Sequence, residues 1–273
     1  MKKYILMAVA GMLALSSCSN GDDEPVAQDA PRQMTFTAAY NDGASTRATL
    51  DFNNEVSFEA DDAISILSAN NTNTKFTTSA GGATATFTGT ATADTKFYAV
   101  HPYTDGLTLD PSTGVISGIE IPTNQSRTSN LFFGWNTAGP IAYATTTGTS
   151  LTFHHACALL KIYQDRGDGI RLKVYTFGGN LTGTFSLDTS NGRLSGGSET
   201  EAIVYNAPNN RPIFFAIAPG TYTGFTCTWE HGMTNYGGIQ KSVPVTFEAG
   251  KIYDLGKTSD IPDFSSSSPA RRD

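Results

Sequence analysis

Residues 33–40 read QMTFTAAY, and their side chains alternate in character along the chain. Successive side chains of a β-strand point to opposite faces of its sheet, so this period of two predicts a half-buried strand. A turn of Asn41, Asp42 and Gly43 then ends the strand. The side chains that share its buried face are Met34, Phe36, Ala38 and Tyr40.

Short alternating segments recur along the rest of the chain at the spacing typical of β-sandwiches. Before a polar run at 145–150, strands are predicted over 56–58, 63–67, 75–77, 83–89, 96–103 and 115–121. After it, they are predicted over 150–164, 171–177, 183–187, 203–205, 213–218, 224–231, 241–247 and 251–255. We therefore expect an all-β fold of two tandem sandwiches, at residues 33–147 and 148–257, with a disordered polar tail at 258–273.

The composition agrees with a β-sheet protein and excludes several other classes. Only 16% of the 273 residues are charged, whereas the chain holds 37 Thr, 23 Ser and 27 Gly. Ordinary soluble domains are about 25% charged, so hydroxyl groups and backbone cover much of this surface. The net charge of −7, with no basic block, argues against a nucleic-acid partner. Heptad patterns typical of coiled coils are missing.

The first 32 residues are typical of an exported and tethered protein. Lys2 and Lys3 precede an apolar run at 4–15, which is too short to cross a bilayer and indicates a cleaved signal peptide at 1–17. The sequence LSSC at 15–18 is similar to a bacterial lipoprotein box, which implies acylation of Cys18 and a lipid anchor. A plain signal peptide with a chance cysteine is the alternative. We expect residues 18–32 to form a flexible tether, whose acidic cluster either resembles a surface-sorting signal of lipoproteins or is a solvated spacer.

The sequence offers no clear catalytic, metal or cofactor site. Adjacent strand residues such as His154 and His155 point to opposite faces, so they would not chelate one ion together. Asp61 and Asp62 fit a turn better than a calcium site, which needs six or more oxygen ligands. Cys157 and Cys227 either form a disulfide or remain buried thiols. We therefore expect no enzymatic activity, no cofactor and no metal.

Several segments, taken in order, resemble the fimbrillin family of Bacteroidetes, the subunits of pili built by strand exchange. The resemblance covers about residues 34–257 and rests on their order and spacing. Besides the box at Cys18, the segments are TRAT at 46–49, EADDAISI at 59–66, FYAVHPY at 97–103, IPTNQ at 121–125, LTFHHACALLK at 151–161 and AGKIYDL at 249–255.

The resemblance implies two transthyretin-like sandwiches, transport to the outer membrane as a surface-exposed lipoprotein, and cleavage after an arginine. Arg47 stands where that site should lie, in a link at 41–49, so the bond to Ala48 is the expected cut. Cleavage would remove the strand at 33–40 and leave unpaired backbone, a template for another chain. Met34, Phe36, Ala38 and Tyr40 would then mark the groove that a strand of another pilin subunit fills.

Three roles remain open at this stage. After Leu255 the chain offers only Ile261 and Phe264 as large apolar residues, which predicts a poor strand donor. A subunit that does not donate a strand is expected at the tip or as an accessory subunit rather than in the shaft. Its further partner would be a host or bacterial surface ligand. An unprocessed anchor is also compatible. The rival functions are a monomeric glycan-binding lipoprotein of the outer membrane and a surface hydrolase. Aromatic candidates for sugar stacking are Trp135, Tyr143 and Tyr236.

Overall fold

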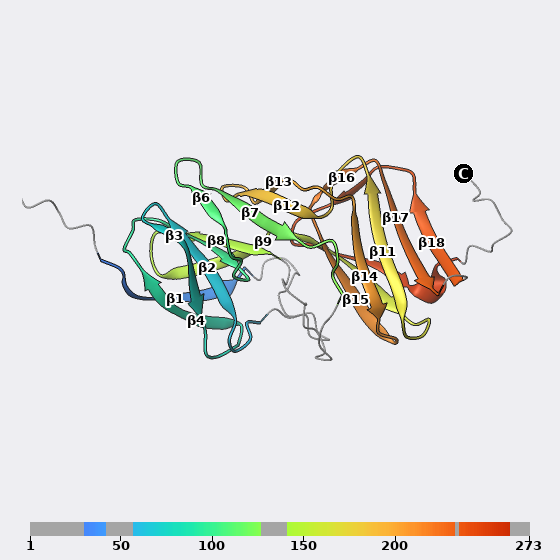
Figure 1. The fold of residues 1–273 in the computed structure, drawn as a ribbon, viewed down its shortest axis with the longest axis horizontal. Helices are drawn as coiled ribbons and strands as arrows, with labels where there is room; N and C mark the ends of the chain where they lie inside the picture. The colour runs from blue at the N-terminus through green and yellow to red at the C-terminus, as the bar shows by residue number, and fades with distance from the viewer. Residues whose placement is uncertain (1–29, 42–56, 127–140, 233–234, 263–273) are drawn as a thin grey trace, which may run out of the picture. The chain divides into compact units, whose positions relative to one another are not determined.

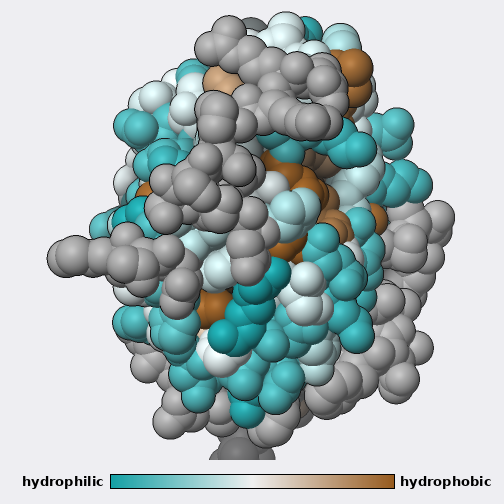
Figure 2. All heavy atoms as spheres, turned by 90° about the vertical axis from the view of Figure 1, so that its right-hand side faces the viewer, coloured by the Kyte–Doolittle hydropathy of each residue, from teal (hydrophilic) through white to brown (hydrophobic). Residues whose placement is uncertain are grey.

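The computed structural model describes residues 30–41, 57–126, 141–232 and 235–262 (Figure 1). Twenty strands cross this part of the chain, and apart from the 3-10 turn η1 (Thr258–Asp260) it contains no helix. The predicted all-β class is confirmed. Figure 2 looks toward the side that carries β18 (Asn235–Lys241) in Figure 1. The described residues on this side are mainly hydrophilic, with hydrophobic residues scattered among them.

The first sheet closes on itself as a seven-stranded barrel, in the order β1-β4-β3-β2-β5-β8-β9. Its strands are β1 (Arg32–Tyr40), β2 (Ala63–Ser68), β3 (Asn71–Thr77), β4 (Thr84–Ala91), β5 (Phe97–His101), β8 (Ala142–Thr146) and β9 (Ser150–His155). The alternating pattern explains its core, because the apolar set of each strand points inward. Phe36, Phe76, Phe87 and Phe153 are each at most 1% exposed and belong to one cluster.

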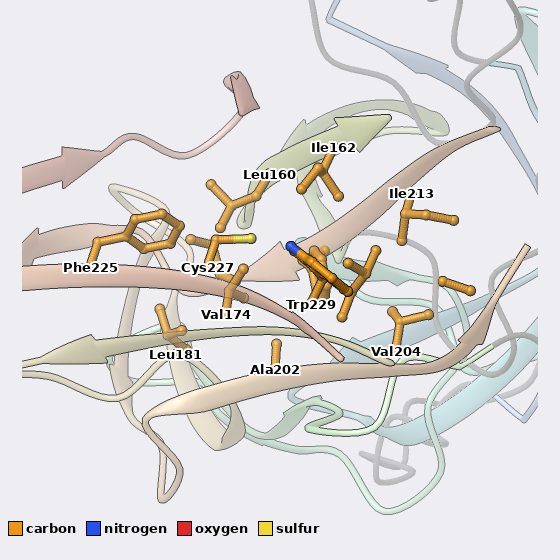
Figure 3. Packing of buried hydrophobic residues seen from close by; sticks show 14 of the residues in the cluster. Leu160, Ile162, Val174, Leu181, Ala202, Val204, Ile213, Phe225, Cys227 and Trp229 are labelled. Carbon is orange, nitrogen blue, oxygen red and sulfur yellow. The ribbon is translucent and has the colours of Figure 1, made fainter. Parts of the chain in front are cut away.

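Two sheets enclose the largest core of the later residues. One has the order β15-β10-β20 and the other β14-β11-β17-β18. Besides β18, their strands are β10 (Ala158–Gln164), β11 (Ile170–Phe177), β14 (Glu201–Ala207), β15 (Arg211–Ile217), β17 (Gly224–His231) and β20 (Ile252–Lys257). Figure 3 shows Leu160 and Ile162 of β10 facing Val174 of β11 and Cys227 of β17 across this core.

A further sheet contains strands from both sides of the predicted boundary. Its order is β13-β12-β7-β6, and a separate pair joins β16 to β19. The strands are β6 (Thr108–Asp110), β7 (Val115–Ile121), β12 (Gly183–Asp188), β13 (Arg193–Gly196), β16 (Gly220–Tyr222) and β19 (Val245–Phe247). Gln125 adds a second link, since its side chain exchanges hydrogen bonds with the backbone of Ala216, at 2.7 and 2.8 Å.

The strand predicted over 150–164 is in fact two strands. The chain ends β9 at His155, passes through Ala156 and Cys157, and enters another sheet as β10. The backbone explains the break, because Ala156 N donates to Ile141 O at 2.8 Å while Cys157 O accepts from Gly250 N at 2.8 Å. The predicted boundary after 147 thus falls in the β8–β9 hairpin, and β9 lies in the closed sheet. The number of domains stays a prediction.

The predicted disordered tail begins too early. Thr258 is fully buried and Ile261 is 2% exposed within the core of the later residues. The Arg166 guanidinium donates to the carbonyls of Thr258 at 2.7 Å and Ile261 at 2.8 Å, and it lies 4.1 Å from the centre of the Trp229 ring. Residues 258–262 are therefore fastened to the fold. Residues 263–273 lie outside the described part.

Candidate functional site

The first strand has a neighbour on each side. Eight residues of β1 pair with β4 in antiparallel register, from Arg32 opposite Ala91 to Ala39 opposite Thr84. Four residues pair in parallel with β9, ending at Tyr40 opposite Phe153. This strand closes the barrel, because its removal would leave β4 and β9 each with one unpaired edge.

The inner face of β1 carries the side chains expected from the alternation. Phe36 and Ala38 are fully buried, Tyr40 is 6% exposed, and Met34 is partly buried against the same cluster. Phe36 meets the rings of Phe76 and Phe97 edge-on, with centroids 5.4 and 5.2 Å away. We call the residues that contact this face the β1 groove. The role of Met34, Phe36, Ala38 and Tyr40 in strand replacement stays a prediction.

Tyr40 fills an aromatic slot at the end of the β1 groove. Its ring stacks on Phe58 and on His155, with centroids 4.8 and 5.1 Å away and interplanar angles of 27° and 9°. Its hydroxyl lies 2.8 Å from Nδ1 of His101. The slot combines residues from three segments, since Phe58 forms an isolated bridge with Gly82 while His155 ends β9 and His101 ends β5.

The electrostatics of this slot keep the Tyr40 hydroxyl protonated. Burial raises its pKa well above the ordinary value, and the nearby Asp62 carboxylate raises it further. On the other side of the imidazole, Nε2 of His101 lies 3.6 Å from Oδ2 of Asp62. The His101 ring thus lies between the Tyr40 hydroxyl and the Asp62 carboxylate, with one ring nitrogen toward each.

The remaining β1 contacts are backbone hydrogen bonds beyond the ladder. Thr37 N donates to Thr149 O at 2.8 Å, and Asn41 N donates to Phe153 O at 3.0 Å. Gly89 faces Met34 across the ladder and has no room for a side chain, because a Cβ there would approach the Phe76 ring to 2.7 Å and Lys75 O to 2.9 Å. The groove is thus shaped by backbone as well as by side chains.

Three predicted site residues fall where the structure gives no account. Cys18, Arg47 and Ala48 lie outside the described residues, as does Trp135. The expected cleavage link at 41–49 begins at Asn41, the residue that follows β1; the rest of the link lies outside the described residues, and the described chain resumes at Ser57. Lipidation at Cys18 and cleavage at Arg47 stay predictions.

The polar motifs considered from the sequence have structural roles. His155 stacks on Tyr40, whereas His154 lies on the other face of β9, with its Nδ1 3.4 Å from Asn41 Nδ2. Asp62 accepts a hydrogen bond from Glu59 N at 2.8 Å, and Asp61 adopts a φ of 69°, which confirms the turn. Among the residues that the structure describes, no three His, Cys, Asp or Glu side chains gather as metal ligands.

Both later cysteines are buried thiols. Cys157 and Cys227 are free and belong to different core clusters. Burial raises the pKa of each thiol to about 12. The disulfide alternative is therefore not realised, and neither thiol is poised for chemistry.

Three exposed aromatic side chains lie on the outer face of the β14-β11-β17-β18 sheet. Tyr236 of β18 is 40% exposed, and Phe177 of β11 and Tyr205 of β14 are exposed to a similar degree. Between them lie two ion pairs, Arg171 with Glu230 and Lys173 with Glu201. Sequence reasoning missed Phe177 and Tyr205, although their places opposite the buried alternation of β11 and β14 could have revealed them. Tyr143 is half-buried against His154.

In the described part of the chain, no helix has the length and apolar character that crossing a membrane requires.

Comparison with known proteins identifies the family. The profile of the fimbrillin-like family matches residues 46–258. A comparison with curated proteins finds no match. Among solved structures, the chain is similar to a candidate cell adhesion protein from Bacteroides uniformis, with a TM-score of 0.52 and 17% identity over 85% of this chain and 95% of that one. It is also similar to a candidate cell adhesion protein from Bacteroides ovatus, with a TM-score of 0.54 and 12% identity over 86% of this chain and 97% of that one. At these identities the structures show a shared fold alone, whereas the profile spans most of the sequence and confirms the resemblance seen in its motifs: the chain belongs to the fimbrillin-like family.

Proposed function

We propose that the protein is a non-enzymatic pilus subunit whose first strand is removed and replaced by a strand of another subunit. The observation that carries this proposal is the place of β1, which pairs on both sides and seals the barrel with its apolar face. Cleavage after Arg47 would separate β1 from the rest of the chain. An open groove with two unpaired edges then accepts a strand by β-augmentation, and no catalytic residue of this chain is needed.

The energetics favour a durable junction between subunits. A fully buried large apolar side chain contributes roughly 1.5–3 kcal/mol, and Phe36 and Tyr40 each fill such a place in β1. Pairing along both edges adds to this, because an intact barrel leaves no open edge. A replacement strand that fills the same places gains the same terms, so the exchanged state rivals the original one in stability.

Membership in the fimbrillin-like family supports a place at the cell surface. We propose that Cys18 is acylated and anchors the precursor in the outer membrane before cleavage at Arg47. A tip or accessory position, with a role in adhesion, agrees with the polar sequence that follows Ile261. The partners are other pilin subunits and, in adhesion, a surface ligand.

Limited digestion of the full chain with an Arg-specific protease tests the cleavage step. We expect a stable core that begins at Ala48, identified by N-terminal sequencing, and the Arg47→Ala chain should resist this cut. A cut after Arg32 instead would leave β1 in place, and the two products differ by 15 residues (47 minus 32). An Arg47–Ala48 bond that resists cleavage in the folded chain would argue against the proposal.

A reversible lock on β1 tests the exchange step. Thr35 and Thr88 are register partners with outward side chains, so cysteines at both positions suit a disulfide between β1 and β4. In a Cys18→Ser background, the cleaved and oxidised chain should exclude a fluorescein-labelled peptide of the β1 sequence QMTFTAAY, and reductant should allow that peptide to enter, as measured by fluorescence polarisation. Peptide entry that is equally fast with the lock closed would refute strand exchange through this groove.

A second function, glycan binding, is favoured by the exposed aromatic face described above. The ion pairs on that face balance in charge, and rings beside fixed donors and acceptors suit a neutral polyol. Tyr205→Ala and Phe177→Ala should then lower binding in a glycan-array experiment, with Thr228→Ala on the same face as the control. Equal binding by all three variants would remove this candidate.

A further inference from the structure

Of the three buried positions of β1, at Phe36, Ala38 and Tyr40, the middle one leaves space for only a small side chain. Ala38 is fully buried between its register partners Ala85 of β4 and Leu151 of β9, which are 4% and 2% exposed. Closely packed interiors tolerate added methylene groups poorly, because side chains must leave their preferred rotamers. A strand that enters here therefore needs alanine, or a residue no larger, at this point.

The Tyr40 position, at the end of β1, requires an aromatic ring with a hydroxyl group. The stack between Phe58 and His155 requires a flat ring, and Nδ1 of His101 lies within hydrogen-bond distance of the ring's hydroxyl, at 2.8 Å. His101 is only 6% exposed, so water does not easily replace a lost partner. Phenylalanine would keep the stack and leave Nδ1 of His101 buried without its hydrogen-bond partner, which is the costly case for a polar group.

The Phe36 position is less selective than the Ala38 and Tyr40 positions. Phe36 sits among the rings of Phe76 and Phe97 and has no polar partner in the contacts of its side chain. An apolar slot of this kind rejects a similar apolar residue only weakly, whereas a site built to pair a hydroxyl rejects the analogue that lacks it. Selectivity therefore lies at the Ala38 and Tyr40 positions.

We propose that the β1 groove selects its partner by sequence, accepting a strand that carries a large apolar residue, then a residue no larger than alanine two positions later, then tyrosine two positions after that. Ala38 and Tyr40 occupy the two selective positions in the precursor, and His101 is the residue that recognises the tyrosine. This inference rests on the proposed strand exchange and adds to it the chemistry of the incoming strand.

The pattern also excludes one occupant. Residues 264–268 of this chain read FSSSS, so Phe264 is followed by serine at the second and fourth positions after it. Phe264 matches the first requirement, but Ser266 brings a hydroxyl into the buried Ala38 position, and Ser268 would leave the aromatic slot empty and His101 without its partner. The segment 264–268 is therefore a poor occupant of the β1 groove, and a fitting strand carries tyrosine at the third place.

Peptide competition on the nicked full chain tests this inference. The chain is cut at Arg47, and fluorescein-labelled QMTFTAAY is bound in place of the released fragment. Unlabelled peptides then compete in a fluorescence polarisation assay. The peptides with Tyr40→Phe and Ala38→Leu should each compete on the order of tenfold less well than QMTFTAAY. A peptide of residues 262–269 should compete more weakly still.

The matched control is a Thr37→Leu peptide, which adds a larger side chain on the exposed face of the strand and should compete like the native sequence. A His101→Leu chain should lose the preference for tyrosine over phenylalanine. Because the decisive changes are in the peptides, folding of the variant chain does not limit the test.

The outcomes separate this inference from the function beneath it. Equal competition by the native, Tyr40→Phe and Ala38→Leu peptides would overturn the proposed selectivity and leave strand exchange standing. A tyrosine preference that survives in the His101→Leu chain would overturn the role of His101. If the native peptide itself fails to enter the nicked chain, both the exchange and its selectivity are refuted.

Discussion

Replacing Phe36 by alanine probes how firmly β1 is held in the barrel. Phe36 is fully buried, and it meets Phe76 and Phe97 edge-on. Truncating a buried phenylalanine costs about 3–5 kcal/mol, from lost transfer free energy and the cavity left behind. Each aromatic pair contributes about 0.5–1.5 kcal/mol beyond its buried area, so we expect the upper part of that range.

The assay is urea unfolding of the uncut chain, monitored by far-ultraviolet circular dichroism. A loss of about 4 kcal/mol corresponds to a Tm lower by roughly 8–16 °C for a protein of this size. Thr35→Ala, on the exposed face of the same strand, is the control and should change the free energy of unfolding by less than about 0.5 kcal/mol.

The same pair of variants connects stability with assembly. After cleavage at Arg47, the Phe36→Ala fragment should leave the groove faster than the unaltered fragment, because most of its anchoring side chain is gone. If the Phe36→Ala chain unfolds at the same urea concentration as the Thr35→Ala chain, the buried face of β1 does not stabilise the barrel, and this account is refuted.

Three further predictions concern other parts of the fold. Ala38→Leu in the uncut chain should lower the free energy of unfolding by about 1–3 kcal/mol through overpacking, measured by urea unfolding. Arg166→Ala should lower it by about 2 kcal/mol and speed hydrogen exchange at 258–262, because the Thr258 and Ile261 carbonyls lose a charged donor. Stability should fall as pH rises above about 8.5, where unfolded thiols ionise while burial keeps the pKa of Cys157 and Cys227 at about 12 in the fold.

Each of these predictions has its own control. Thr37→Leu adds volume on the outer face of β1 and should leave stability nearly unchanged. Lys173→Ala removes a surface cation without touching 258–262, so exchange there should stay slow. For the alkaline loss, a Cys227→Ala chain should show a shallower decline between pH 8.5 and about 10. An identical slope in that variant would mean that the thiol does not contribute.

Local pattern was enough to predict much of the chain. The alternation at 33–40 predicted β1 and the face that it buries, because the period of two is a property of any extended backbone. The same logic predicted the turn at Asp61 and Asp62, since short carboxylates bond nearby backbone amides. The motif order indicated the family for a similar reason: each motif keeps its place in the sequence whatever the tertiary contacts.

Long-range pairing could not be predicted in this way. The residue types around 156–157 do not predict that the chain changes sheets there. The change depends on two backbone hydrogen bonds, one from Ala156 N to Ile141 O and one from Gly250 N to Cys157 O. The burial of Ile261 also depends on a distant residue, Arg166, which fastens 258–262. The polar composition of that segment therefore suggested disorder where the fold supplies partners.

The alternation of residues 33–40 is sufficient to predict a strand with one apolar face. The position of this strand between β4 and β9, and the contacts of Tyr40 with His101, Phe58 and His155, depend on the folded chain. The physical reason is that alternation is encoded by neighbouring residues, whereas a slot is assembled from side chains 18 to 115 positions away, at 58 and at 155. Their shape and hydrogen-bonding needs exist only once the barrel has closed.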